Sequence, residues 1–386
     1  MRSLLSFMLS LLLLFGWIRP AMAGTELNWI EVETNRSGYE KATGPREWQF
    51  PRDFGPHEAY QTEWWYYTGN LETEAGRAFG FQLTFFRQAV KPTEVQATSD
   101  WRNNQIYSAH FTVSDIQAKQ FYDFERFSRS GNGLAGANSE PYTVWLEDWS
   151  VDTIDNRIVK INAEDSDIKI NLDVENLMKP VLQGDHGFSV KGIDPGNASQ
   201  YYSLVQQKTH GTIEIKGESH QVKGLTWKDH EFSTSALSQG TVGWDWFSIQ
   251  LNDGSALMLY LLRRENGELE ATSAGKYVAA DGQTTALTLD DWQIAVLDRW
   301  QSPHSKATYP SQWKLAIPKL GLNLQAQAWM NDQELNTATA TYWEGAVKYD
   351  GVKQDKPVSG NGYVELTGYA TRLDTVLGDR TQLSDN

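Results

Sequence analysis

Apolar and polar residues alternate with a period of two along most of this chain, a spacing that predicts β-strands with one buried face. The segment AFGFQLTFF, for example, places Phe79, Phe81, Leu83 and Phe85 on one face. The same alternation recurs in IYSAHFTV, DIKINLDV and LGLNLQAQAW, and clusters of Gly, Asn and Asp separate such segments at 131–136, 194–197, 252–254 and 359–362. No segment has the period of a helix longer than two or three turns. We therefore predict an all-β protein built as a sandwich or barrel.

Two distant segments, EWWYYTGNLETEAGRAFGFQLTFF and GWDWFSIQLNDGSALMLYLL, share one layout of aromatic residues, turn and apolar strand. Trp64 corresponds to Trp244, and Tyr66 corresponds to Trp246. This internal similarity favours two similar antiparallel β domains in tandem, over 46–235 and 236–386. The small residues of 233–243 form the expected linker, and 24–45 form an extended lead-in.

The first residues have the layout of a secretory signal peptide. One arginine precedes an apolar run over 4–18, and the small residues Ala21 and Ala23 mark a cleavage site after Ala23. The run is short for a bilayer span and Pro20 follows it, so a membrane anchor is the less favoured interpretation. No later segment resembles a transmembrane helix. We expect residues 1–23 to be removed and the protein to be periplasmic or secreted by a bacterium.

Charge and composition exclude several classes of site. The 386 residues carry a formal charge of -15 and no cysteine, so disulfides, thiolate metal sites and cysteine nucleophiles are excluded. Basic residues are not clustered, and nucleic acid is therefore not an expected partner. The seven histidines show no paired spacing, and the chain has no G-x-S-x-G elbow. We expect no metal and no cofactor.

The aromatic stretch HEAYQTEWWYYTGNL suggests either a core or a ligand pocket. On a strand, Glu63, Trp65 and Tyr67 share one face while Trp64 and Tyr66 share the other, so both faces should be covered. A buried carboxylate at Glu63 needs a hydrogen-bonding partner. The residues predicted to surround a hydrophobic ligand are Glu63, Trp64, Trp65, Tyr67, Trp227, Trp244 and Trp246.

Four residues are candidates for acid–base chemistry. Asp229 stands beside His230 in GLTWKDHEF, although neighbouring residues of a strand point to opposite faces. Asp245 lies between two tryptophans in GWDWF and is either a carboxyl with a raised pKa or a turn anchor. Tyr260 lies on the strand that follows the NDG turn. A hydrogen-bonded structural role for the Asp229–His230 pair is the alternative.

The ordered set EWWYYTGNL, FGFQLTFFR, GLTWKDHEF, GWDWFSIQL, YWEGAV and GYVELTGY resembles the secreted hydrolase-like, or attachment-protein-like, family related to carotenoid 1,2-hydratase. The resemblance extends over about 45–375 and implies two lipocalin-like barrels with an aromatic pocket near the domain junction. It also implies chemistry in which an isoprenoid double bond is protonated and water captures the cation, which aromatic faces would stabilise.

The match to the family's site residues is incomplete. The resemblance implies a His-x-Trp and a Tyr-x-Asp pair. His230 and Tyr260 match their first members, but Phe232 and Leu262 occupy the positions of the tryptophan and the acid. The sequence contains no nucleophile motif or metal site that would support the name hydrolase.

Three functions are consistent with these observations. The favoured one is an exported lipocalin-like protein that binds a hydrophobic, isoprenoid- or lipid-like small molecule near the domain junction. The second is a hydratase-like enzyme acting on an alkene or polyene. The third is a carbohydrate-active protein, for which Glu63, Asp245 and Glu344 are possible carboxylates. Tryptophans in an open cleft would favour the third, and tryptophans in a closed chamber would favour the others.

Overall fold

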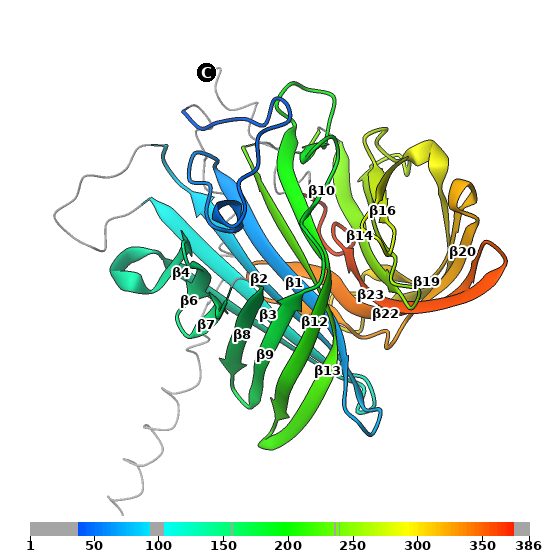
Figure 1. Cartoon of the computed structure of the whole chain (residues 1–386), viewed down its shortest axis with the longest axis horizontal. Coiled ribbons are helices and arrows are strands. Elements are labelled where there is room, and N and C mark those ends of the chain that lie inside the picture. Colours follow the sequence, from blue (N-terminus) through cyan, green and yellow to red (C-terminus); the bar gives the residue numbers. More distant parts are fainter. Residues whose placement is uncertain (1–37, 93–103, 156, 235–236, 239, 374–386) are drawn as a thin grey trace, which may run out of the picture.

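The computed structural model describes residues 38–92, 104–155, 157–234, 237–238 and 240–373. The predicted signal peptide, the first part of the lead-in and the cleavage site after Ala23 lie outside these ranges. Within them, no helix is long and apolar enough to cross a membrane. The predicted all-β architecture is confirmed, because the chain forms two barrel-like antiparallel sheets, one nearly closed and one a half-barrel (Figure 1).

The first sheet contains thirteen strands in the order β4-β3-β2-β1-β13-β12-β9-β8-β7-β6-β5, with β10 and β11 paired to β12. The strands are β1 Thr62–Glu72, β2 Ala78–Ala89, β3 Gln105–Asp115, β4 Gln120–Arg129, β5 Ala135–Ser139, β6 Tyr142–Leu146, β7 Trp149–Thr153, β8 Ile158–Asp165, β9 Ile168–Asn176, β10 Val181–Leu182, β11 Phe188–Val190, β12 Ala198–Ile215 and β13 Glu218–Ser233. The long strand β13 closes this sheet onto β1 and so brings the end of the first half back beside its beginning.

The second sheet contains ten strands in the order β17-β16-β15-β14-β23-β22-β20-β19-β18, with β21 paired to β22. The strands are β14 Thr241–Leu251, β15 Ala256–Arg264, β16 Ala274–Val278, β17 Thr284–Thr288, β18 Gln293–Gln301, β19 Thr308–Ile317, β20 Leu322–Ala328, β21 Glu334–Asn336, β22 Thr341–Lys353 and β23 Lys356–Leu366. Four 3-10 turns complete the described elements: η2 Arg52–Phe54, η3 Gly131–Gly133, η4 Leu289–Asp291 and η5 Pro318–Leu320. The two similar sequence segments become the first hairpin of each sheet.

Alternation along the strands builds three apolar layers. The inward faces of the first sheet bury Trp65, Tyr67 and Phe81 in one core, and Trp313 and Trp343 lie in the core of the second sheet. A third cluster lies between the two sheets, where β1 packs against β23 and β2 against β22 (Figure 1). Both faces of β1 are therefore covered, as its aromatic residues on both faces predict.

Candidate functional site

Titratable groups and aromatic rings face one another between the two sheets, in a region that we call the seam. We use the word seam for the facing side chains of Tyr66, Tyr201, Trp227, Asp229, Trp244, Trp246, Tyr260, Glu344 and Glu365. The first sheet contributes residues from β1, β12 and β13, and the second contributes residues from β14, β15, β22 and β23. Polar groups and aromatic rings thus meet in a buried layer, away from the barrel cores.

Two carboxyl groups of the seam lie side by side. Glu344 on β22 is in register with Glu365 on β23, a cross-strand position in which Cβ atoms lie about 5 Å apart. The hydroxyl of Tyr66 donates to Oε1 of Glu344 at 2.6 Å. The other oxygen, Oε2, is buried and finds no hydrogen-bond partner among the described residues. Burial, together with the charge of Glu365, raises the pKa of Glu344 well above its ordinary value.

Glu365 has a defined partner and a different acidity. Its Oε2 accepts a hydrogen bond from the indole N–H of Trp244 at 2.7 Å. Burial raises the pKa of Glu365 to about 7, and the neighbouring charges of Asp229 and Glu231 act in the same direction. The seam therefore holds one carboxyl whose protonated form is favoured by burial and a second that is partly ionised at neutral pH.

Asp229 forms the polar centre on the side of the first sheet. It accepts hydrogen bonds from the Trp227 indole at 2.7 Å, from the Ser203 hydroxyl at 2.5 Å and from the Tyr201 hydroxyl. The indole of Trp246 in turn donates to the Tyr201 oxygen at 3.2 Å, which joins the two sheets. Burial raises the pKa of Asp229 to about 7.

Tyr260 lies at one border of the seam, next to a cation. The ammonium of Lys191 lies 4.3 Å from the centre of the Tyr260 ring and 3.0 Å from Oε1 of Glu231. The Tyr260 hydroxyl donates to the Val190 carbonyl at 3.2 Å. Lys191 also faces the Tyr201 ring, so Tyr260 and the Asp229 centre share one neighbouring cation.

The structure separates the four predicted acid–base residues. Asp229 and Tyr260 lie in the seam, but His230 points to the opposite face of β13. There, its Nε2 donates to Glu63 at 2.8 Å. Asp245 points into the second sheet, where the Arg263 guanidinium lies 2.8 Å away and the Tyr369 hydroxyl donates to it at 3.0 Å.

The predicted ring set is divided in the same way. Trp227, Trp244 and Trp246 contribute to the seam, and Trp64 packs against it. Trp65 and Tyr67 are fully buried in the core of the first sheet, on the same face as Glu63. Because the seam tryptophans are largely buried between the sheets, they do not form the open cleft that a carbohydrate-active protein would need.

Sequence reasoning missed the carboxyl pair. The sequence suggests Glu344 only as a possible glycosidase carboxylate, and Glu365 lies in a segment whose alternation is typical of an ordinary half-exposed strand. The available signal was that each carboxylate lies on a strand rich in aromatic residues, in YWEGAV and GYVEL. Their pairing could not be read from either segment alone.

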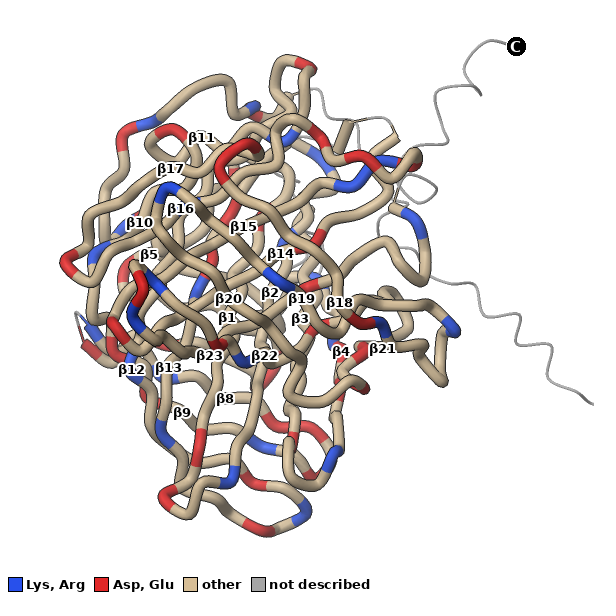
Figure 2. The backbone as a smooth tube through the Cα atoms, turned by 90° about the vertical axis from the view of Figure 1, so that its right-hand side faces the viewer, with Lys and Arg blue, Asp and Glu red and all other residues tan. Residues whose placement is uncertain are grey.

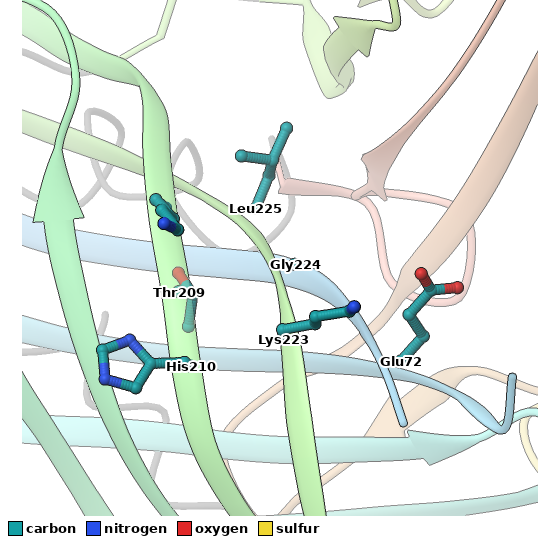
Figure 3. Close-up of a pocket in the computed structure, with 7 residues that line it drawn as sticks. Glu72, Thr209, His210, Lys223, Gly224 and Leu225 are labelled. Carbon is teal, nitrogen blue, oxygen red and sulfur yellow. The ribbon is translucent and has the colours of Figure 1, made fainter. Parts of the chain in front are cut away.

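Two surface hollows lie away from the seam. Figure 3 shows the larger, about 620 Å³, which is lined by Glu72, Lys208, Thr209, His210, Lys223, Gly224 and Leu225. The smaller, about 340 Å³, is lined by Phe54, Arg157, Asn176, Leu177, Met178, Lys179, Pro180 and Leu204. None of the residues predicted to bind a ligand lines either hollow. Basic and acidic residues are interspersed over the backbone in Figure 2.

Comparison with known proteins identifies relatives along nearly the whole chain. The model of the AttH-like family matches residues 41–369. The crystal structure of an AttH from Nitrosomonas europaea is 33% identical, with a TM-score of 0.76, over 86% of this chain and 99% of that chain. Kievitone hydratase of Fusarium solani subsp. phaseoli is 24% identical over 267 residues, which are 67% of this chain and 73% of the relative.

A second solved structure extends the likeness in fold. The crystal structure of kievitone hydratase from Nectria haematococca has a TM-score of 0.64 at 16% identity, over 86% of this chain and 96% of that chain. At that identity the likeness shows the fold alone. Together these matches confirm the family resemblance inferred from the sequence motifs.

Proposed function

We propose, since the chain belongs to the AttH-like family, that it is a hydratase-like enzyme that adds water to a carbon–carbon double bond at the seam. One observation carries the proposal: Glu344, which is fully buried, and Glu365, which is partly buried, pair across two strands beside aromatic rings, and the pKa of each is raised. The relative named kievitone hydratase supports a reaction of this class.

Hydration begins with an acid that protonates one carbon of the double bond. Glu344 suits this step because burial raises its pKa well above the ordinary value and so favours the protonated form. Its Oε1 already accepts the Tyr66 hydrogen bond, so the acidic proton resides on the unpartnered Oε2. When the π electrons form the new C–H bond, Glu344 becomes a carboxylate and the other carbon becomes cationic. The rings of Tyr66 and Trp246, which pack edge to face with centres 5.1 Å apart, are the neighbouring aromatic groups that would stabilise such a cation.

The second step captures the cation with water and needs a base. Glu365 has a pKa of about 7 and is held by Trp244, so its ionised form is available at neutral pH. It takes one proton from water while the water oxygen forms the C–O bond. The product is an alcohol, and a proton transfer from Glu365 to the neighbouring Glu344 restores the starting state. Alkene and water are the only reactants consumed.

The seam suggests a hydrophobic substrate with an alkene group, in line with the isoprenoid- or lipid-like ligand expected from the sequence. The facing side chains of the seam combine aromatic rings with few charged donors, and the Lys191 ammonium lies at its border. The sequence layout of residues 1–23 supports export to the periplasm or beyond as part of the same proposal.

The proposal is tested with Glu344→Gln, which keeps the shape of the side chain and the Tyr66 hydrogen bond but removes the acid. Wild-type protein and variant are incubated with kievitone and with an acyclic terpenoid in water labelled with oxygen-18, and labelled alcohol is measured by mass spectrometry. We expect labelled alcohol from the wild type and at least a hundredfold less from the variant. The exposed Glu147→Gln is the matched control.

Two results would overturn the proposal. One is turnover by Glu344→Gln at the wild-type rate, which would remove Glu344 from the mechanism. The other is retention of an alkene ligand by the wild type without any incorporation of labelled oxygen, which would identify a binding protein.

A further inference from the structure

The fold brings two of the seven histidines onto one buried carboxylate, far from each other in sequence. Glu63 is on β1, His230 is on the neighbouring β13, and His57 lies in the segment that precedes β1. Oε1 of Glu63 lies 2.8 Å from Nε2 of His230 and 2.9 Å from Nδ1 of His57. One donor atom from each of the three residues thus lies within 4.8 Å of the others.

A further polar group contacts each of the three side chains through an atom that does not face the other two. Nε2 of His57 lies 3.3 Å from Oδ1 of Asp53, and Nδ1 of His230 lies 3.0 Å from the Tyr202 hydroxyl. Oε2 of Glu63 accepts from Nε of Arg87 at 2.9 Å. Partners of this kind fix the ring orientation and tautomer of metal-binding histidines and orient a ligating carboxylate. The atoms left facing one another are two imidazole nitrogens and one carboxylate oxygen.

Aromatic packing restrains the two imidazole rings. The His57 ring stacks on Phe232 with centres 3.6 Å apart and 9° between the planes. The His230 ring stacks on Trp65 at 5.0 Å and 26°. The side chains of Glu63 and His230 are completely buried, whereas that of His57 is 9% exposed, so an ion would enter from the His57 side.

From this arrangement we infer a binding site for a divalent transition-metal ion of the zinc type, ligated by His57, Glu63 and His230. Two imidazoles and one carboxylate with a fourth position for water are an established ligand set for Zn²⁺. Metal–ligand bonds of about 2.0–2.2 Å in a tetrahedron separate the ligand atoms by about 3.4 Å. The two distances from Glu63 Oε1, 2.8 Å to His230 and 2.9 Å to His57, must therefore lengthen by about 0.5 Å, a displacement within the reach of side-chain rotation.

The protons of the cluster can rearrange to suit an ion. With an ion bound, His57 would keep a proton on Nε2, facing Asp53, and the proton of His230 would move from Nε2 to Nδ1, facing the Tyr202 oxygen. Asp53 and Glu63 supply negative charge, Arg46 and Arg87 form ion pairs with them, and the buried Lys228 lies near Glu63 and His230. The ion would tie the segment before β1 to β1 and β13. It lies on the face of β13 opposite Asp229, so the site is independent of the proposed hydration.

The test uses the full chain, stripped of metal with EDTA and then titrated with Co²⁺ and, separately, Zn²⁺. We expect one equivalent of Co²⁺ to bind with visible d–d absorption, one equivalent of Zn²⁺ to remain after dialysis, and Zn²⁺ to raise the Tm. His57→Gln should lose the absorption, the bound equivalent and the Tm rise. His210→Gln, which alters an exposed histidine outside the cluster, should keep all three.

The cobalt titration of the wild type decides the question even if His57→Gln does not fold. Absence of d–d absorption together with less than a tenth of an equivalent of Zn²⁺ would show that the three residues form only a hydrogen-bonded cluster. A full equivalent of Zn²⁺ bound by folded His57→Gln would place the ion elsewhere, and either result overturns the inference.

Discussion

Replacing Glu365 by Gln should remove a pH-dependent destabilisation that is built into the seam. In the folded protein, Glu365 is partly buried between the sheets, accepts a hydrogen bond from the Trp244 indole and faces other carboxyls. A glutamine preserves the shape and can accept the same hydrogen bond. It cannot ionise, however, so the free energy of unfolding should lose the part of its pH dependence that belongs to this group.

The size of the effect follows from the shift in acidity. The pKa of Glu365 rises from an ordinary value of 4.5 to about 7 on folding. Between these pH values the folded protein binds more protons than the unfolded chain, so the stability contributed by the protonated group is complete below pH 4.5 and is lost as pH rises to about 7. At ~1.4 kcal/mol for each pH unit, the loss reaches about 3 kcal/mol.

The measurement is urea denaturation of wild type and Glu365→Gln between pH 4.5 and pH 8 at constant ionic strength. We expect the difference in unfolding free energy to change by about 3 kcal/mol in favour of the variant as pH rises. Glu74→Gln, in an exposed turn, is the matched control and should follow the wild type throughout. A difference that stays flat over this range would show that Glu365 is not held in a desolvated site, and the assignment of Glu365 as the base would fall with it.

Two further substitutions test the packing around the two sites. Arg87→Met leaves the Glu63 carboxylate buried without its cation and should lower the free energy of unfolding by about 3–5 kcal/mol in urea denaturation at pH 7. Replacing Arg157, which belongs to an exposed surface ion pair, should lower it by less than about 1 kcal/mol. Equal losses of stability in the two variants would contradict a buried Arg87–Glu63 pair. A Cβ on Gly80 would lie 2.8 Å from the Tyr363 hydroxyl and 2.9 Å from the Ala346 methyl group. Gly80→Ala should therefore force the sheets apart and lower stability by about 1–3 kcal/mol in thermal denaturation, and an unchanged Tm would show that the two sheets are loosely packed at this point.

Sequence alone predicted the features that depend on the alternation of apolar and polar residues within a single strand. The segment AFGFQLTFF lies within β2 (Ala78–Ala89), and the aromatic residues on both faces of β1 correctly predicted that both faces are covered. Alternation is visible within a single strand because a strand exposes its two faces to different surroundings. The all-β class and the repeated opening hairpin follow from the same information.

The sites could not be predicted because they depend on pairing between distant strands. Tyr66 donates to Glu344 across 278 positions of sequence, and His230 reaches Glu63 across 167. No local spacing encodes either contact. The absence of paired spacing among the histidines likewise carried no information about His57 and His230, which the β1–β13 pairing brings together.

The alternation of β13 explains why two unrelated chemistries can occupy neighbouring residues. In the register of β1 and β13, Trp65 pairs with His230 and Tyr66 pairs with Asp229. Because successive side chains point to opposite faces, His230 belongs to the inner cluster, whereas Asp229 belongs to the seam. A one-residue slip of this pairing would exchange the two faces, burying Asp229 against Glu63 and moving His230 between the sheets. The pairing of β1 with β13 is therefore the feature on which the proposed hydration and the inferred metal site both depend.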